Sequence, residues 1–546
     1  MQATSLLGPD ARLNGSSVGF SGFTFHNLKA EKPRELDTPT AQMTSDPSIT
    51  HKNKASLKVD KDGLPLIPQP SASPLDPLNY PNWLKYWTLL ELSLLAFVSS
   101  FTGAIINPAV PELAHEFGIS PHVATYQSTA YIGLSAVVSL ILIPFANAYG
   151  HRMIFILASF LTAVFLIIAA ESTSFGMLII FRGLSAFHEV NIVLGVAAIP
   201  NIFFVDQRGR ATGFYIFVHQ LLHLSPVIGG YISFRLGWRW TLRFGAILQG
   251  FMVSVLIVLL PDTLFQRPDT NVTLDVRHDL MISDTKPYQP PRMALSTYLR
   301  CLRLVDPERM PKQGVRFSDI FLRPLRLLRY PSILLPALSN AVVTSFGTYG
   351  PSVIGPSQFT EIFKFNSAQN GLATGLSIVI GSFIGELLSG WVTDLLIRRA
   401  RAKASKSGEV VQAELRLRGF WLGAVIVPLG LLMFGFTIQY ADTPIAPCIA
   451  IGFTSIGAQI VTGVCYAYSC NDCYPMQSSD ISQIFSFFKA LFTLSLTFYE
   501  VPLARKIGYQ WAFTAFALFC VIIFSGVVTL VFKGAKWREN APNMPS

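Results

Sequence analysis

The chain has 546 residues, of which 51% are hydrophobic and 14% are charged, and its mean hydropathy is +0.44. Soluble domains carry about 25% charged residues, so this composition excludes an ordinary soluble protein and indicates a membrane protein. The formal net charge is +10, but the lysines and arginines lie mainly between apolar segments. We therefore expect them to orient the chain in a lipid bilayer and do not expect nucleic-acid binding.

The chain begins with residues 1–77, which are rich in serine, proline, asparagine and lysine and lack a basic start followed by an apolar core. We expect a disordered cytosolic tail here and not a signal peptide. Apolar stretches of about 20 residues then recur, each near the length that crosses about 30 Å of hydrocarbon as a helix. Twelve spans are predicted, at residues 87–110, 126–147, 154–170, 177–203, 211–232, 244–260, 333–353, 372–396, 421–438, 445–468, 481–501 and 511–532.

The spans form two groups of six. Residues 78–260 and 331–532 make the two halves, residues 261–330 form a polar and basic central linker, and residues 533–546 form a short tail. This layout predicts an all-α polytopic membrane protein with twelve transmembrane helices in two six-helix halves around a central cavity. The linker, the short tail and the basic stretch 398–418 fall on one side of the membrane. The positive-inside rule therefore predicts that both termini are cytosolic. We expect a monomer, most simply in the plasma membrane.

The fourth predicted span carries three ionisable side chains, Arg182, His188 and Glu189. Charged groups inside a membrane span are costly, so they are taken as candidates for a functional site. If the span is helical, Arg182, Ser185 and Glu189 share a face. Protonation of Glu189 would then release Arg182 to another partner and couple proton binding to helix rearrangement. The alternatives are a static buried ion pair and a solvated end of the span.

The fifth predicted span carries His219 and His223, followed by Pro226, Gly229 and Gly230. The histidines are four residues apart and would share a helical face, either as a proton relay near neutral pH or as packed, hydrogen-bonded residues. Proline bends a helix and the glycines let a neighbouring helix approach closely. These residues are therefore candidates for gating as well as for packing.

No metal site is predicted. His188 and Glu189 begin a zinc-protease pattern, but Ile192 stands where the second histidine is required.

In the second half, Asn340, Tyr466, Tyr468 and Lys489 are candidates to face the cavity. Lys489 lies well inside the eleventh span, so it should pair with a carboxylate, a backbone carbonyl or a substrate acid. Glu386 is a further candidate proton site, unless it lies near the cytosolic end of its span.

One short pattern occurs at the same place in each half. Its first copy contains Asn147, Gly150, His151 and Arg152 after the second span, and its second copy contains Gly390, Asp394, Arg398 and Arg399 after the eighth. These residues resemble the loop motif of the major facilitator superfamily, Gly-x-Leu-x-Asp-x-x-Gly-Arg-Arg. The first copy has Asn147 and His151 where the family has an acidic and a basic residue, whereas the second keeps both.

Other stretches strengthen this resemblance. Phe181-Arg182-Gly183-Leu184 is similar to the family's fourth-span arginine motif, residues 224–230 to its fifth-span antiporter motif with Ser225 for the first glycine, and residues 260–263 to its Pro-Glu-Thr. The second half, including residues 481–502, is similar to fungal members of the twelve-span drug:proton antiporter branch. The resemblance implies that the loop residues and the Pro226 bend act in gating.

The same resemblance implies a proton-coupled secondary transporter that exports a small hydrophobic or amphipathic compound, a xenobiotic or a fungal secondary metabolite, by alternating access. No Gly-x-x-x-x-Gly-Lys-Ser/Thr occurs, so we expect no direct use of ATP, no cofactor and a proton gradient as the energy source. The alternatives are an uptake carrier or facilitator for a polyamine, sugar or other nutrient on the same fold, and a nutrient receptor that does not transport. A membrane enzyme is disfavoured because no nucleophile or metal constellation is present.

Overall fold

The computed structural model describes residues 58–59, 66–265, 267, 288, 293–304, 326–407, 413–440, 442–474 and 477–539, all of which belong to one compact unit. Residues 1–57 and 60–65 of the predicted tail, most of the central linker and residues 540–546 lie outside this part. The side chains of Asp394 and Arg398 also lie outside it, although both positions belong to a helix.

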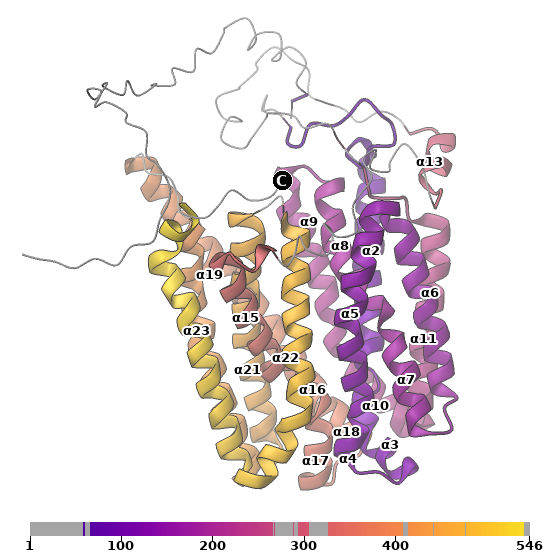
Figure 1. Cartoon of the computed structure of the whole chain (residues 1–546), viewed down its shortest axis with the longest axis vertical. Helices are drawn as coiled ribbons and strands as arrows, with labels where there is room; N and C mark the ends of the chain where they lie inside the picture. The colour runs from indigo at the N-terminus through magenta and orange to yellow at the C-terminus, as the bar shows by residue number, and fades with distance from the viewer. Residues whose placement is uncertain are drawn as a thin grey trace, which may run out of the picture. The chain divides into compact units, whose positions relative to one another are not determined.

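The N-terminal half is a series of helices joined by short turns (Figure 1). Three 3-10 segments interrupt or connect its longer helices. In chain order the elements are α2 (Asn82–Ala104), η2 (Asn107–Ala109), α3 (Val110–Phe117), α4 (Pro121–Ala124), α5 (Tyr126–Tyr149), α6 (His151–Ala170), α7 (Phe175–Leu184), η3 (Ser185–His188), α8 (Glu189–Ile202), α9 (Val205–Gln220), η4 (Leu221–Leu224), α10 (Ser225–Leu236) and α11 (Trp238–Leu259).

The C-terminal half has the same general construction, and three of its short segments, η5, η6 and η8, are π-helical. Before it, the described part of the linker contains the short helix α13 (Leu295–Cys301). The elements of this half are α15 (Pro331–Thr344), η5 (Ser345–Tyr349), α16 (Gly350–Val353), α17 (Gly355–Phe363), α18 (Ser367–Gly371), η6 (Leu372–Leu376), α19 (Ser377–Ser407), η7 (Ala413–Gly419), α20 (Phe420–Tyr440), α21 (Ile445–Tyr466), η8 (Ala467–Cys473), α22 (Ser478–Ile507) and α23 (Tyr509–Glu539).

Ten stretches of the described helices are long and apolar enough to cross a membrane, and each matches one of the predicted spans. The predicted fifth and seventh spans are also helical, over residues 205–236 and 331–353, but they are not among these ten. Both contain a helix irregularity, η4 in the fifth and η5 in the seventh, and both carry polar residues within the span. The all-helical membrane fold is therefore confirmed, and the count of twelve spans is confirmed for ten.

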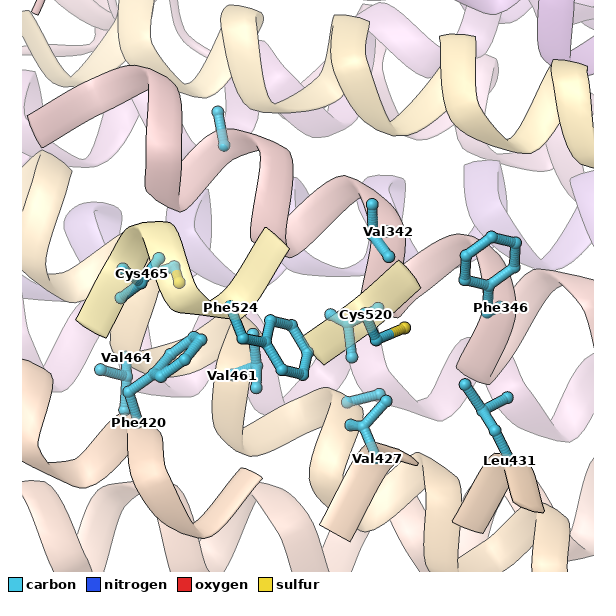
Figure 2. Packing of buried hydrophobic residues seen from close by; sticks show 14 of the residues in the cluster. Val342, Phe346, Phe420, Val427, Leu431, Val461, Val464, Cys465, Cys520 and Phe524 are labelled. Atoms are coloured by element: carbon cyan, nitrogen blue, oxygen red, sulfur yellow. The ribbon is translucent and has the colours of Figure 1, made fainter. Parts of the chain in front are cut away.

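Each half has a hydrophobic core of its own. Figure 2 shows part of the core of the C-terminal half, where side chains from several helices interdigitate. There Phe346 stacks on Phe516 with 4.8 Å between ring centroids, and Phe420 packs edge-on against Phe524 at 5.3 Å. Lipid tails are as apolar as these side chains, so the helices within each half are held together mainly by close van der Waals packing.

The two ends of the bundle differ in how the halves meet. At one end, here called the termini end, α2 and α15 begin and α11 and α23 finish, whereas α3, α4, α17 and α18 lie at the opposite end (Figure 1). At the opposite end, Asn107 Nδ2 donates to Ser352 Oγ across the halves at 3.2 Å, and the rings of Tyr126 and Phe498 lie 5.7 Å apart. The halves are closed against each other there.

A segment before the first long helix, residues 66–80, packs onto the termini end of the N-terminal half. Leu78 is fully buried in it, and Asp76, also fully buried, pairs with Arg267 of the linker at 2.7 Å. The prediction that a disordered tail extends to residue 77 is therefore wrong for residues 66–77. A buried ion pair with a residue almost two hundred positions away holds this polar-looking segment in place, and such a contact is invisible to local composition.

Candidate functional site at the interface of the two halves

Arg182 lies at the centre of a fully buried polar network in the N-terminal half. Its guanidinium donates to Gln127 Oε1 at 3.2 Å, to Ser185 Oγ at 3.1 Å and to the carbonyl of Gly103, and it lies over the Tyr131 ring at 4.5 Å. Among the described residues no carboxylate pairs with Arg182. The charge is instead stabilised by neutral acceptors and an aromatic face, which suit the planar, multi-donor guanidinium.

His188 joins the same network through Tyr131. The Tyr131 hydroxyl lies 2.9 Å from His188 Nε2, and His188 Nδ1 lies 2.7 Å from the carbonyl oxygen of Ser185. Because a carbonyl can only accept, Nδ1 carries a hydrogen, and in neutral histidine Nε2 then accepts from the tyrosine hydroxyl. Proton occupancy at His188 and the orientation of Tyr131 are thus linked.

Glu189 lies beside this network and interacts with Tyr131, but its charged partner is in the other half. Its Oε1 lies 3.5 Å from Lys489 Nζ of the C-terminal half, and the side chains of Glu189 and Lys489 remain 11% and 23% exposed. Lys489 Nζ also lies 5.7 Å from the centre of the Tyr349 ring, in η5. The prediction that Lys489 pairs with a carboxylate, a carbonyl or a substrate acid is met here by the carboxylate of Glu189. This ion pair joins the two halves directly.

The predicted Arg182–Glu189 pair is therefore not formed. The expectation assumed one continuous α-helix, but the four residues of η3 lie between α7 and α8. A 3-10 segment turns about 120° per residue instead of about 100°, so η3 adds roughly 80° of rotation between the flanking helices. Arg182 keeps its contact with Ser185, whereas Glu189 is turned toward the C-terminal half.

The two histidines of the fifth span are separated by a similar irregularity. His219 lies in the last turn of α9 and its Nε2 lies 3.0 Å from Ser100 Oγ, while His223 lies in the 3-10 segment η4. The hydrogen bond to Ser100 gives His219 the packed, hydrogen-bonded environment that was the alternative to a relay. No contact in the structure tests the relay itself, which stays a prediction.

The backbone of α10 around Pro226, Gly229 and Gly230 packs directly against neighbouring backbone. Its contact with α18 is called the α10–α18 seam below. A Cβ at Gly229 would collide with the carbonyl of Ile105 in its own half, and a Cβ at Gly230 would collide with the carbonyl of Ser367 in the other half. The carbonyl of Pro226 similarly occupies the space that a Cβ on Gly371 would need. α10 and α18 can approach this closely only because both present glycine.

The first copy of the loop motif binds within its own half, at the termini end. His151 Nδ1 lies 2.9 Å from Thr263 Oγ1 and its Nε2 lies 3.4 Å from Asn147 Oδ1. Arg152 donates through Nε to the carbonyl of Leu260 at 2.6 Å and through its backbone amide to Asp262. Arg152 thus caps the end of α11, while Asn147 holds His151 against the turn that follows it.

The remaining candidates of the second half are dispersed. Tyr466 packs its ring against Phe485 at 4.4 Å and interacts electrostatically with Lys489, so it belongs near the ion pair. Asn340 is buried and contacts Thr344 of its own helix. Glu386 receives a 3.5 Å hydrogen bond from Gln459, within the same half.

Tyr468 is not placed near the ion pair. Its hydroxyl donates to Glu414, which pairs with Arg538 at the termini end. The π-helical segment η8 begins directly after Tyr466, and residues two apart on a helix point to nearly opposite sides, so Tyr466 and Tyr468 face different surroundings. In the second loop motif, Gly390 is exposed and has open space around it.

The sequence analysis missed several members of the network, namely Asn107, Gln127, Ser128 and Tyr131. They form a chain in which Gln127 donates to Ser128 at 2.6 Å and Ser128 donates to Asn107 at 3.1 Å. Gln127 and Tyr131 are four residues apart near the start of the second span, so a polar stripe on one helical face was the available signal.

Comparisons with known proteins agree on one family. The family model described as Major Facilitator Superfamily matches residues 92–496. The MFS transporter fsa7 of Fusarium sp. is 25% identical over 511 residues, covering 90% of this chain and 89% of the relative. The efflux pump radE of Floropilus chiversii is 24% identical over 481 residues, covering 86% of this chain and 84% of the relative. Among solved structures, a bacterial homolog to the human lysosomal transporter Spinster has a TM-score of 0.54 at 14% identity and covers 86% of this chain and 100% of that one, a likeness that shows the fold.

Proposed function

The chain belongs to the Major Facilitator Superfamily and is a multi-pass membrane transporter, not an enzyme, and we propose that it exports a small hydrophobic or amphipathic compound in exchange for protons. The transported compound would be a xenobiotic or a fungal secondary metabolite. Alternating access between the two halves would carry it across, with no cofactor and with the proton gradient as the energy source.

The proposal includes an orientation. We assign the termini end to the cytosol and the opposite end to the outside of the plasma membrane, because the basic loops cluster at the termini end. With the opposite end closed, the conformation described here is one in which Glu189 and Lys489 would be reached from the cytosol.

The observation that carries the coupling is the ion pair between Glu189 and Lys489. It connects the halves at a distance of 3.5 Å, long enough for either partner to be displaced. Its attraction opposes separation of the halves, because each charge would lose its partner inside the membrane. The empty carrier is therefore held in place.

Two events would break the ion pair between Glu189 and Lys489 and so let the halves move. A proton on Glu189 removes the charge that attracts Lys489, and a polar group of the substrate can bind Lys489 in place of the carboxylate. Because either event suffices, the carrier moves when it holds a proton or a substrate and stays when it holds neither. That is the condition for exchange of one for the other.

The export direction is supported by the relatives. One of them, radE, is named an efflux pump, and its alignment with this chain covers 84% of its own length. The probable efflux pump mfs2 of Aspergillus flavus supports it in the same way, at 25% identity over 443 residues. The close α10–α18 seam around Gly230 supports a closed outer end through which cargo cannot return in this conformation.

The test is retention of labelled hydrophobic and amphipathic compounds in cells with and without the gene, before and after collapse of the proton gradient. Export predicts higher retention without the gene, and a rise to that level when the gradient is collapsed in cells that have it. Lower uptake without the gene would favour an importer instead. No difference for any compound would favour a receptor, and it would contradict transport of these cargo classes.

A further inference from the structure

Five polar side chains converge on one place between the halves. Lys489 of α22 pairs with Glu189 of α8, and it also interacts electrostatically with Tyr349 of η5 and Tyr466 of α21. His219, in the last turn of α9, interacts with Lys489 as well. Except for Glu189, each of these side chains is half-buried. The place where they meet therefore has walls from both halves and keeps accessible surface.

The charges at this place do not balance. Arg182 lies over the Tyr131 ring at 4.5 Å, and Tyr131 in turn interacts with Glu189. Among the described residues no carboxylate pairs with Arg182, and Glu189 is the one carboxylate that interacts with Lys489. Two cations therefore share a single carboxylate. In the low dielectric of a membrane protein this excess positive charge attracts an anion.

Lys489 is the cation that an occupant can reach. Its side chain is 23% exposed, whereas Arg182 is fully buried. The 3.5 Å between Lys489 Nζ and Glu189 Oε1 exceeds the usual length of about 2.7–2.9 Å for a hydrogen bond between an ammonium and a carboxylate. An ammonium has three N–H donors, so Lys489 can also donate to the oxygen of a second acid.

Aromatic rings lie beside this ammonium. The centre of the Tyr349 ring is 5.7 Å from Lys489 Nζ, and the Tyr466 ring packs on Phe485 with 4.4 Å between centroids. Half-buried rings of this kind offer flat faces to the apolar body of a small molecule. A positively charged molecule would meet Lys489 and the excess positive charge, which discriminates against it. The surroundings of Lys489 thus suit an apolar body with an acidic group.

We propose that the cargo is an organic anion, and that Lys489 binds its carboxylate or sulfonate while the rings of Tyr349 and Tyr466 contact its apolar body. With His219 neutral, the charges of Arg182, Lys489, Glu189 and a singly charged cargo add up to zero. The assignment rests on the proposed function, because it takes this place as the cargo site, and it narrows the cargo from amphipathic compounds to acidic ones.

The test is equilibrium dialysis of the full-length protein in detergent, at about pH 8 and without any gradient. The tritiated probes are naphthylacetate, naphthylacetamide and naphthylethylammonium, which share a ring system and differ in charge. At this pH the acid is ionised and the amine is protonated. The parent protein should bind the anion at least about tenfold more tightly than the amide, and the cation most weakly.

Variants of the ion pair identify the group that reads the charge. Glu189→Gln should bind the anion more tightly than the parent does, because the carboxylate no longer competes for Lys489. Glu189→Gln combined with Lys489→Gln leaves no unpaired charge, and it should bind the anion no more tightly than the amide. Lys489→Arg should keep the preference for the anion. The control is Lys506→Gln, an exposed lysine at the end of the same helix, which should bind all probes as the parent does.

Equal affinities of the parent for anion and amide would overturn the assignment, and so would tighter binding of the cation or binding of none of the probes. A preference for the anion that persists in the double variant would overturn the role of Lys489. Dialysis requires no transport, so the two proposals can fail separately. Anion binding without any difference in cellular retention would contradict export alone, whereas export without an anion preference would contradict this assignment alone.

Discussion

Gly150 shows how one residue determines the turn between α5 and α6. Its φ is +115°, a conformation that L side chains rarely adopt, and a Cβ there would lie 2.7 Å from Asp262 Oδ2. The turn thereby brings the start of α6 to the end of α11, where Arg152 caps the helix.

We predict that Gly150→Ala destabilises the protein by about 1–3 kcal/mol, because alanine meets both the backbone strain and the contact with Asp262. The measurement is thermal unfolding of the purified protein in detergent. Gly176→Ala is the matched control, since Gly176 has open space around it and an ordinary φ. Equal unfolding temperatures for the two variants would show that the turn tolerates a side chain.

At this scale the sequence identified the individual charges but not their partners. Arg182, Glu189 and Lys489 were found because ionisable groups inside apolar spans are conspicuous. Their pairing depends on the rotation that η3 introduces and on a contact between residues three hundred positions apart. Neither is encoded in local spacing, so the predicted Arg182–Glu189 pair was wrong.

At the scale of elements, the seam between α10 and α18 holds the opposite end closed. Gly230 and Gly371 place backbone against backbone, because each faces a carbonyl of the other helix. The sequence predicted that glycines of the fifth span allow close helix approach, and the structure confirms this for Gly229 and Gly230. It could not predict that Gly230 serves the contact between the halves.

Gly230→Ala should shift the protein toward an open opposite end, because the added methyl group collides with the Ser367 carbonyl only in the closed arrangement. Nitroxide labels on Thr173→Cys and Lys506→Cys, exposed positions in the first and second halves, would report this by double electron–electron resonance as a larger population with the longer distance at fixed pH. Gly213→Ala, in the preceding helix and with open space around it, should behave as the parent does. An unchanged distance distribution in Gly230→Ala would mean that the seam does not hold this end closed.

The docked segment 66–80 is a second element-scale feature. Burial tends to raise the pKa of the Asp76 carboxyl, but the hydrogen bonds and charge of Arg267, with the amides of Ser71 and Leu78, hold that pKa below its usual range. When folding lowers the pKa of a carboxyl, that carboxyl stabilises the folded state. The stabilisation is fully present at pH values above the pKa in the unfolded state, which is about 3.9 for aspartate. This stabilisation is lost as the pH falls through the folded pKa.

We therefore predict that residues 66–80 stay protected at neutral pH and are released below about pH 4. Hydrogen exchange of this segment over a pH series, corrected for the intrinsic pH dependence of exchange, is the measurement. Asp76→Asn should lower protection at neutral pH and remove most of the acid-dependent change. A segment in Asp76→Asn that is as protected as in the parent would show that the ion pair with Arg267 does not hold it.

At the scale of the whole molecule, the two halves, the helical fold and the family were predictable because apolar spans repeat and the loop motif recurs. The conformation was not predictable, because closure at one end depends on contacts between residues far apart in the chain, such as Asn107 with Ser352. The Glu189–Lys489 pair is the one ion pair between the halves among the described residues. In the proposed mechanism, a proton on Glu189 would therefore act on both halves at once.

Removing one partner of this pair should be more harmful than removing both. Lys489→Met leaves Glu189 without its cation inside the membrane, whereas Lys489→Met combined with Glu189→Gln leaves no unpaired charge. We predict a lower yield of folded protein for the single variant and recovery in the double variant, measured by size-exclusion chromatography in detergent. Equal yields would indicate that the pair contributes little to the folded state.

Proton-driven export is tested most directly by the steady-state ratio of internal to external labelled cargo in cells, taken at two external pH values. In parent cells the ratio should fall as the outside becomes more acidic, because more protons drive export. Glu189→Gln resembles the permanently protonated residue, so this variant should only equilibrate the cargo across the membrane, with no dependence on pH. The control is Glu171→Gln, which removes an exposed carboxylate from an ion pair within one half and should behave as the parent does. Export against the gradient by Glu189→Gln, with the pH dependence of the parent, would show that Glu189 does not couple protons to transport.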